Sequence, residues 1–266
     1  AEAMAIVGMD AYFGDCAGIE NFVDTVKNNR RHFRALPTMR WSGIEKETGL
    51  LNQLAFAAPA GAYIDQFEMD FLRFKIPPND KDQLIPQQLL MMKVADNAAM
   101  QAGLKEGANV AVLVAMGVEL DLHSYRGRVN LATQIETALA RSGVAISEEQ
   151  RNELTNIAKD SIASAAQLNQ YTSFIGNIMA SRISSLWDFS GPAITVSAEE
   201  NSVYRCLSLA DNLFRTSDVE AIIVAAVDLA GSAENVFLRS RFAPISVDAT
   251  SNGINVGEGA GSVVLK

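Results

Sequence analysis

The fold is decided by residues 191–202, which read Gly191-Pro192-Ala193-Ile194-Thr195-Val196-Ser197-Ala198-Glu199-Glu200-Asn201-Ser202. The run 193–196 is typical of a parallel strand that helices cover on both faces, because neither of its faces needs to meet water. A helical pattern then begins near Ser202. The stretch therefore predicts a strand, a sharp turn and a helix, a junction that holds side chains at a helix N-terminus.

Working outward, apolar strands alternate with helical patterns along most of the chain. The predicted strands are residues 5–7, 109–116, 193–196, 221–227 and a short last one, 262–265. The predicted helices cover about 18–28, 86–102 and 202–215. In the first helix, Ile19, Phe22, Val23 and Val26 have the spacing of a stripe that packs on a sheet. This alternation predicts an α/β fold.

Two stretches interrupt that alternation. Residues 29–80 mix aromatic and turn residues without periodicity, which indicates a long, ordered, irregular excursion. Residues 117–170 are predicted to form a helical insertion, in which Ser147 and Gln150 have the spacing of a capping box.

Composition excludes several classes of function. The chain has 22 Lys and Arg against 31 Asp and Glu, a net charge of -9, so neither nucleic acid nor an anionic membrane surface is an expected partner. No apolar run approaches the roughly 18 residues that span a bilayer, and residues 1–10 do not resemble a signal peptide. A cytoplasmic location is expected. Cys16, Cys206, His32 and His123 have no zinc-ligand spacing, so no metal site and no disulfide framework is predicted.

The junction after the decisive strand carries Glu199 and Glu200. A helix N-terminus favours ionised carboxylates, which are poor acyl nucleophiles. The two acids are therefore either ordinary first-turn residues or remnants of a catalytic position. Cys206 lies further along the same helix and is predicted to be a core residue that faces another direction, whereas Cys16 lies in a loop with no visible activating partner.

The run Gly257-Glu258-Gly259-Ala260-Gly261 is glycine-rich but precedes a strand instead of following one. A dinucleotide site needs the opposite order, so this run is not a phosphate cradle. We expect a tight turn in which Gly257, Gly259 and Gly261 let backbones approach closely.

Several motifs together resemble the β-ketoacyl synthases of the thiolase superfamily. They are 5–9 (AIVGM), 64–67 (IDQF), 86–90 (PQQLL), 180–184 (ASRIS), Gly191-Pro192 and 257–261 (GEGAG). The resemblance implies a thiolase-like α/β fold with a mixed, mostly parallel sheet and helices on both faces. It also implies that residues 1–266 are the N-terminal half of a two-half fold. The C-terminal half, with the catalytic histidines of the family, is absent from this chain and is expected to exist in the natural protein.

In that family the strand-turn-helix junction reads roughly Gly-Pro-x-x-x-Val-Asp-Thr-Ala-Cys-Ser-Ser, and its cysteine accepts the acyl group. Counting from Gly191-Pro192 places Glu200 at the cysteine. The resemblance therefore implies a chain-length factor without the nucleophile, and residues 71–79 (FLRFKIPPN) and 174–182 (FIGNIMASR) look most like that domain of bacterial polyunsaturated fatty acid synthases.

The partners implied by the resemblance are an active ketosynthase, as a heterodimer, and an acyl carrier protein. A homodimer in isolation is a further possibility. No cofactor is expected to bind directly, and the substrate is presented as a phosphopantetheine thioester on the carrier. The acyl tunnel would be lined by Met116, Tyr171, Phe174 and Met179, although methionine often only fills a core.

An enzymatic alternative makes Glu200 the acid/base of a malonyl-thioester decarboxylase or of an acyltransferase-type synthase domain. Some relatives decarboxylate with glutamine at the cysteine position. An ionised Glu200 cannot donate to an oxyanion as that amide does. It would also repel the malonyl carboxylate by about 1 kcal/mol or more at close range.

Overall fold

The computed structural model describes residues 4–38, 40–41, 43–54, 57–76, 84–117, 122–162, 175–248 and 253–266. Its centre is a seven-stranded mixed sheet in the order β2-β1-β7-β6-β4-β5, with β3 paired to β7. The strands are β1 (Ile6–Phe13), β2 (Cys16–Ala17), β3 (Gly61–Ala62), β4 (Val110–Met116), β5 (Ala193–Val196), β6 (Ala221–Leu229) and β7 (Val256–Leu265). The predicted α/β class is confirmed.

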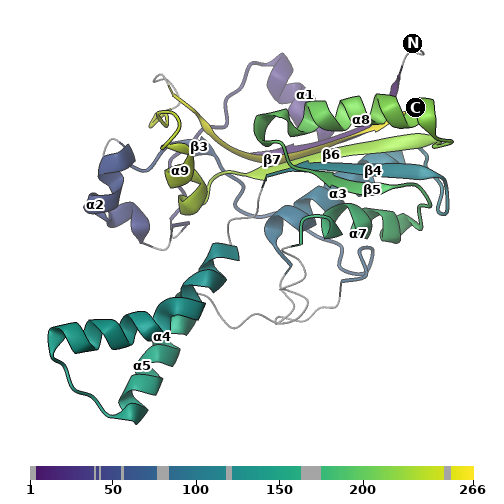
Figure 1. The fold of residues 1–266 in the computed structure, drawn as a ribbon. Coiled ribbons are helices and arrows are strands. Elements are labelled where there is room, and N and C mark those ends of the chain that lie inside the picture. The colour runs from purple at the N-terminus through teal and green to yellow at the C-terminus, as the bar shows by residue number, and fades with distance from the viewer. Residues whose placement is uncertain are drawn as a thin grey trace.

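Helices lie on both faces of the sheet (Figure 1). Helices α1 and α8 are on one face and α3 and α7 on the other, while α4 and α5 form a hairpin that projects from the body. The α-helices are α1 (Ile19–Lys27), α2 (Thr48–Leu51), α3 (Pro86–Gln101), α4 (Leu122–Ser142), α5 (Glu148–Ile162), α7 (Ile178–Trp187), α8 (Ser202–Thr216) and α9 (Ala233–Arg239). Short 3-10 turns cover η1 (Ile44–Lys46), η2 (Asn52–Leu54) and η3 (Glu199–Asn201).

The two central strands, β4 and β6, separate two hydrophobic clusters, one on each face of the sheet. Side chains alternate across a strand, so one face of β4 joins α3 and α7 in a first cluster while the other face joins α8 in a second. In α3, which the sequence predicts as a helix, Leu90, Val94 and Ala98 share the buried face, and each is 0% exposed. Gly103 follows α3 with a φ of 64°, the left-handed conformation that ends helices and favours glycine.

The first strand differs from its prediction. The sequence predicts a strand over 5–7, whereas β1 covers Ile6–Phe13 and is antiparallel to β7, from Ile6 opposite Leu265 to Phe13 opposite Gly259. Ile6 is 55% exposed. Helix α1 buries none of its residues, and the predicted inward residues Val23 and Val26 are exposed, because α1 covers only the margin of the sheet beside β1 and β2.

The predicted tight turn at Gly257, Gly259 and Gly261 is wrong. All three glycines lie inside β7, and the strand is much longer than the expected 262–265. Gly259 and Gly261 lie between β1 and β6, whereas Gly257 pairs with Ala62 of β3. The close backbone approach was correctly anticipated. A Cβ at Gly259 would overlap the Phe13 ring and lie 2.8 Å from the Tyr12 carbonyl oxygen. Gly259 and Gly261 make room for the Phe13 ring of the neighbouring strand, whereas a Cβ at Gly257 would meet no atom within 4 Å.

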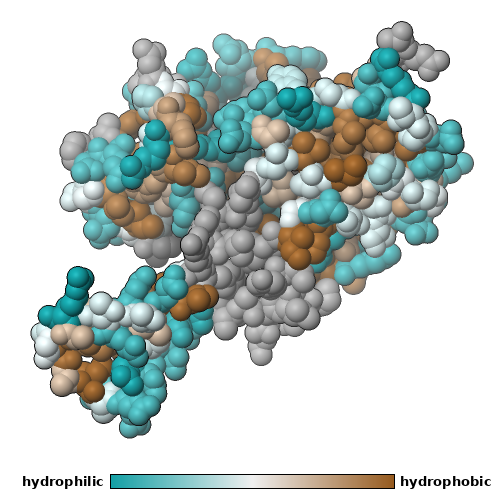
Figure 2. Space-filling model, in the orientation of Figure 1, coloured by the Kyte–Doolittle hydropathy of each residue, from teal (hydrophilic) through white to brown (hydrophobic). Residues whose placement is uncertain are grey.

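Helices α4 and α5 lie within the predicted insertion, residues 117–170, and the described residues of the excursion 29–80 form short turns, α2 and β3. Residues of the excursion form a third cluster with α9 and β7, which includes Trp41, Leu54 and Tyr63. In the hairpin, Ser147 and Gln150 form the predicted capping box, with reciprocal bonds of 3.0 and 3.1 Å. The hairpin surface is partly apolar (Figure 2), and Ile157 is 62% exposed. None of the helices within the described ranges combines the length and the apolar character needed to cross a bilayer.

Candidate functional site

The junction between β5 and α8 forms as predicted, as a strand, the tight turn η3 and a helix. The buried Ser202 hydroxyl accepts the Ala198 N–H at 2.9 Å and donates to the Glu199 carbonyl at 2.7 Å. Glu199 has a φ of 52°, a left-handed conformation that is uncommon for a residue with a Cβ. Such backbone strain persists where the surroundings enforce it, and it is frequent at functional sites.

The side chains of Glu199 and Glu200 are both exposed at this turn. No thiol lies there, since Cys206 is in the second turn of α8 and is 0% exposed. Burial raises the pKa of the Cys206 thiol to about 11, which makes it an inert core group, as predicted. The turn thus presents carboxylates to solvent and offers no acyl-accepting sulfur.

Cys16 has neighbours that the sequence did not reveal. Its sulfur lies 3.2 Å from the Thr25 hydroxyl, which in turn lies 2.9 Å from Nε2 of His32. The Cys16 side chain is buried, so this chain of contacts joins β2, α1 and the following segment without exposing a nucleophile.

The predicted tunnel residues divide into two groups. Met116, at the end of β4, and Met179, in α7, are both buried in the first core cluster together with Met91 of α3. Tyr171 and Phe174 lie outside the described residues. The structure therefore brings two candidates into one apolar cluster, and a role of the four in lining a tunnel stays a prediction.

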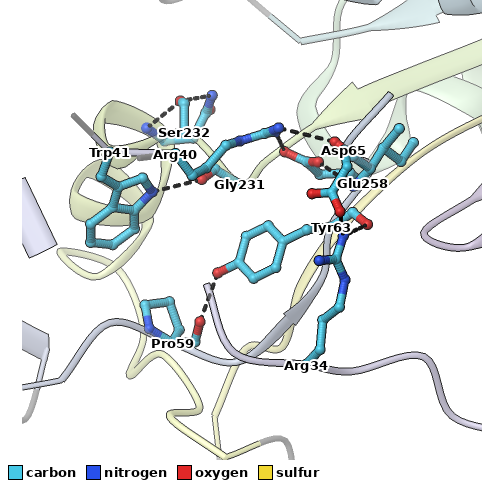
Figure 3. A network of polar contacts seen from close by, with 11 residues as sticks. Arg34, Arg40, Trp41, Pro59, Tyr63, Asp65, Gly231, Ser232 and Glu258 are labelled. Carbon is cyan, nitrogen blue, oxygen red and sulfur yellow. Dashed lines mark hydrogen bonds and ion pairs between the residues drawn. The ribbon is translucent and has the colours of Figure 1, made fainter. Parts of the chain in front are cut away.

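A polar network surrounds Glu258, near the N-terminal end of β7 (Figure 3). The Glu258 side chain is 0% exposed, forms an ion pair with Arg40 and accepts the Ile64 N–H at 2.8 Å. Arg40 also donates to the Ile64 carbonyl at 3.0 Å. Arg34 donates to the Tyr63 carbonyl at 3.0 Å and pairs with Asp65 at 2.8 Å.

This network fastens the excursion to the sheet. The Tyr63 hydroxyl donates to the Pro59 carbonyl at 2.7 Å, and burial, together with the nearby Glu258 charge, raises the pKa of Tyr63 to about 12. The Trp41 indole donates to the Gly231 carbonyl at 2.9 Å, which joins the excursion to the end of β6. Sequence reasoning missed these partners. The only available signal was a glutamate enclosed by glycines in the 257–261 run.

No metal centre is formed by the described part of the chain, because no three His, Cys, Asp or Glu residues in it converge into a possible ion site. His123 is the second residue of α4, but its side chain is outside the described residues.

Comparison with known proteins gives one consistent family. The model of the β-ketoacyl synthase N-terminal domain matches residues 1–266. A polyunsaturated fatty acid synthase polypeptide of Thraustochytrium is 36% identical over 99% of the chain. A phenolphthiocerol/phthiocerol polyketide synthase polypeptide of Mycobacterium tuberculosis is 27% identical over 100% of the chain. The chain spans 13% of the length of each of these relatives.

Solved structures show the same fold. A protein described as the PfaC keto synthase-chain length factor is 60% identical over 99% of the chain, with a TM-score of 0.93, and the chain covers 28% of it. A ketosynthase from the bacillaene synthase of Bacillus subtilis has a TM-score of 0.70 at 20% identity, and the match covers 100% of this chain and 40% of that ketosynthase chain. That second likeness concerns the fold alone.

Proposed function

Because this chain belongs to the β-ketoacyl synthase family and matches its N-terminal domain, we propose that it acts as a chain-length factor in a polyunsaturated fatty acid synthase. In this role it pairs with an active ketosynthase and shapes the tunnel that holds the growing acyl chain. The acyl group arrives as a phosphopantetheine thioester on an acyl carrier protein. The chain itself forms no thioester.

The observation that carries this proposal is the composition of the β5–α8 turn. The family motif expects a nucleophilic cysteine at the residue that is Glu200 in this chain, and both cysteines of the chain are buried elsewhere. A carboxylate does not replace a thiolate in forming a stable thioester. The 60% identity to a protein described as a keto synthase-chain length factor supports the same role.

Pairing with a partner is supported by β5, which hydrogen-bonds to β4 alone among the strands of the described chain. The strand is apolar, yet Ile194 is 36% exposed. An apolar edge strand with an open side is a template for another chain.

Acyl loading tests the proposal directly. The polypeptide that carries this chain is mixed with a separately expressed ketosynthase and an acyl carrier thioester, and mass spectrometry locates the bound acyl group. We expect to find the acyl group on the ketosynthase cysteine. We also expect the length of the product to depend on the presence of this chain. An acyl group on any residue of this chain would overturn the proposal.

The enzymatic alternative is tested by malonyl-carrier decarboxylation with the wild type, Glu200→Gln and a matched control, Glu199→Gln. General acid/base catalysis by a carboxyl usually relies on burial, and Glu200 is exposed. We expect the wild type to show only background turnover. Wild-type turnover that Glu200→Gln abolishes and Glu199→Gln preserves would make this domain an enzyme.

A further inference from the structure

The inference concerns α5, the second helix of the hairpin that projects from the body of the molecule (Figure 1). An open groove runs along one face of this helix. Its described lining residues recur every three or four positions, which is the spacing of a single helix face; they are Glu149, Glu153, Asn156, Ile157, Asp160 and Ser161. All six are exposed, so this face of α5 is turned to solvent.

The burial of α5 is inverted with respect to hydrophobicity. Its buried residue in the described chain is a threonine, Thr155, whereas Ile157 is 62% and Leu154 42% exposed. Helices α4 and α5 contact each other, so the hairpin is held by one face of α5 while these larger aliphatic side chains remain in water. Exposed aliphatic residues that lie together on a projecting helix indicate a contact face.

The same face carries acidic residues without a counter-charge. Within the described chain, neither Glu149 nor Glu153 takes part in an ion pair. The third acid of the groove, Asp160, pairs with Arg128 of α4 at 2.8 Å. The two cations of α5 are not among the described residues that line the groove. Carboxylates four residues apart on a helix repel each other, so a positive group placed between Glu149 and Glu153 would remove a repulsion.

A protein helix is the ligand that fits both the charge and the apolar character of this face. A metal ion does not fit, because the described residues form no cluster of three possible ligands and an ion gains nothing from Ile157. Nucleic acids and membrane surfaces present phosphates, which acidic residues repel. An amphipathic helix binds in a groove by its apolar side chains, and opposite charges fix its orientation.

We propose that the α5 groove binds a basic amphipathic helix from a synthase domain other than the paired ketosynthase. The Lys or Arg side chains of that helix lie against Glu149 and Glu153, and one of its apolar side chains covers Ile157. The synthase relatives are long polypeptides of which this chain spans 13%, so most of their length lies outside the matched part and can supply such a domain. The inference goes beyond the proposed chain-length role.

Photo-crosslinking in the intact synthase, reconstituted from its purified polypeptides, tests the inference. Benzoylphenylalanine replaces Asn156, which lines the groove beside Ile157, and mass spectrometry identifies the residue that it captures. We expect capture of one helix that carries Lys or Arg, with a yield that falls as the salt concentration is raised. Capture of the ketosynthase, of this chain itself or of a segment without Lys or Arg would overturn the inference, and so would the absence of any capture.

Charge variants test the role of the two glutamates in the same assay. The double substitution Glu149→Gln and Glu153→Gln is expected to lower the crosslink yield by about 5- to 10-fold. Glu148→Gln is the matched control, because Glu148 begins the same helix but is not among the described residues of the groove. It is expected to leave the yield unchanged. An unchanged yield in the double variant contradicts the inference.

Thermal unfolding separates a contact role of Ile157 from a structural one. Ile157→Ser is expected to lower the crosslink yield and to leave the melting temperature of the polypeptide nearly unchanged, because the side chain is already largely in water. A clear loss of thermal stability would show that Ile157 packs within this chain, and the apolar part of the contact would be wrong. None of these outcomes alters the proposed chain-length role, which acyl loading tests separately.

Discussion

Strands β4 and β5 are neighbours in one sheet, run parallel and read alike in the sequence, yet their surroundings are opposite. Every residue of β4 is buried, whereas no residue of β5 is. Strand β4 lies between β6 and β5 with helices on both faces. Strand β5 pairs with β4 on one side, and on the other side no described strand pairs with it; its Thr195 bonds only to Gly176 and Asn177 there.

This difference separates two reasons for an apolar strand. The apolar side chains of β4 are used for the stability of this chain. The apolar side chains of β5 are only partly buried within this chain, and the proposed ketosynthase would cover their exposed surface. Substitutions in the two strands should therefore divide between loss of stability and loss of binding.

The largest effect is expected from Leu113→Ala in β4. Leu113 is 0% exposed and packs among β4, β6 and α8. Removing a buried leucine side chain costs about 2–5 kcal/mol of the free energy of unfolding. Ile194→Ala in β5 is the matched change, and it is expected to cost about 1 kcal/mol or less because Ile194 is already partly in water. Urea unfolding measures both.

The same pair of variants should reverse its order in a binding assay. Ile194→Ala is expected to weaken ketosynthase binding, whereas Leu113→Ala should bind normally under conditions in which it remains folded. Equal losses of stability for the two variants would mean that β5 is covered as fully as β4, and the comparison would fail.

The contrast between β4 and β5 also marks what the sequence could predict. The apolar runs identified both as strands, and the spacing of residues 191–202 located the strand-turn-helix junction. The same local pattern predicted a helix over 86–102, which is α3. These features depend on local pattern, which a single sequence carries.

Features that depend on distant neighbours were not predictable. The sequence predicts a turn at 257–261 because nothing local shows that Phe13 packs across Gly259 and Gly261. The burial of Glu258 required Arg40, which is 218 residues away.

A further prediction uses pH to probe the face of β4 that packs against α8. Cys206 of α8 packs in the cluster that contains Leu113, and burial raises the pKa of its thiol from 9.0 to about 11. Between pH 9 and 11 the unfolded chain loses this proton while the folded chain keeps it. The free energy of unfolding therefore falls as pH rises through this window, by at most about 2–3 kcal/mol. Below pH 9 this contribution is fully present.

Because lysines and tyrosines titrate in the same range, the informative quantity is the difference between the wild type and Cys206→Ala. The variant is expected to be less stable near neutral pH, and the gap should narrow as pH increases from 9 to 11. Two parallel stability curves would show that the thiol is not held protonated by burial, and that the β4 side is more open to water than the structure indicates.

The smallest effect is expected at the open edge itself, from Asn177→Ala. This substitution removes the only acceptor that the described chain offers to the outward Thr195 N–H. The bond is exposed, so we expect a cost of about 0.5–1 kcal/mol. Hydrogen exchange should report it most clearly, with the Thr195 amide exchanging a few-fold faster in the variant while the amides of β4 stay protected. Thr195→Val is the control, since it removes the hydroxyl bond to Gly176 but keeps the N–H and its acceptor.

If a partner strand covers this edge, ketosynthase should restore slow exchange at Thr195 in Asn177→Ala. If the Thr195 amide still exchanges fast in the complex, the partner binds elsewhere, and its binding does not explain the exposure of β5.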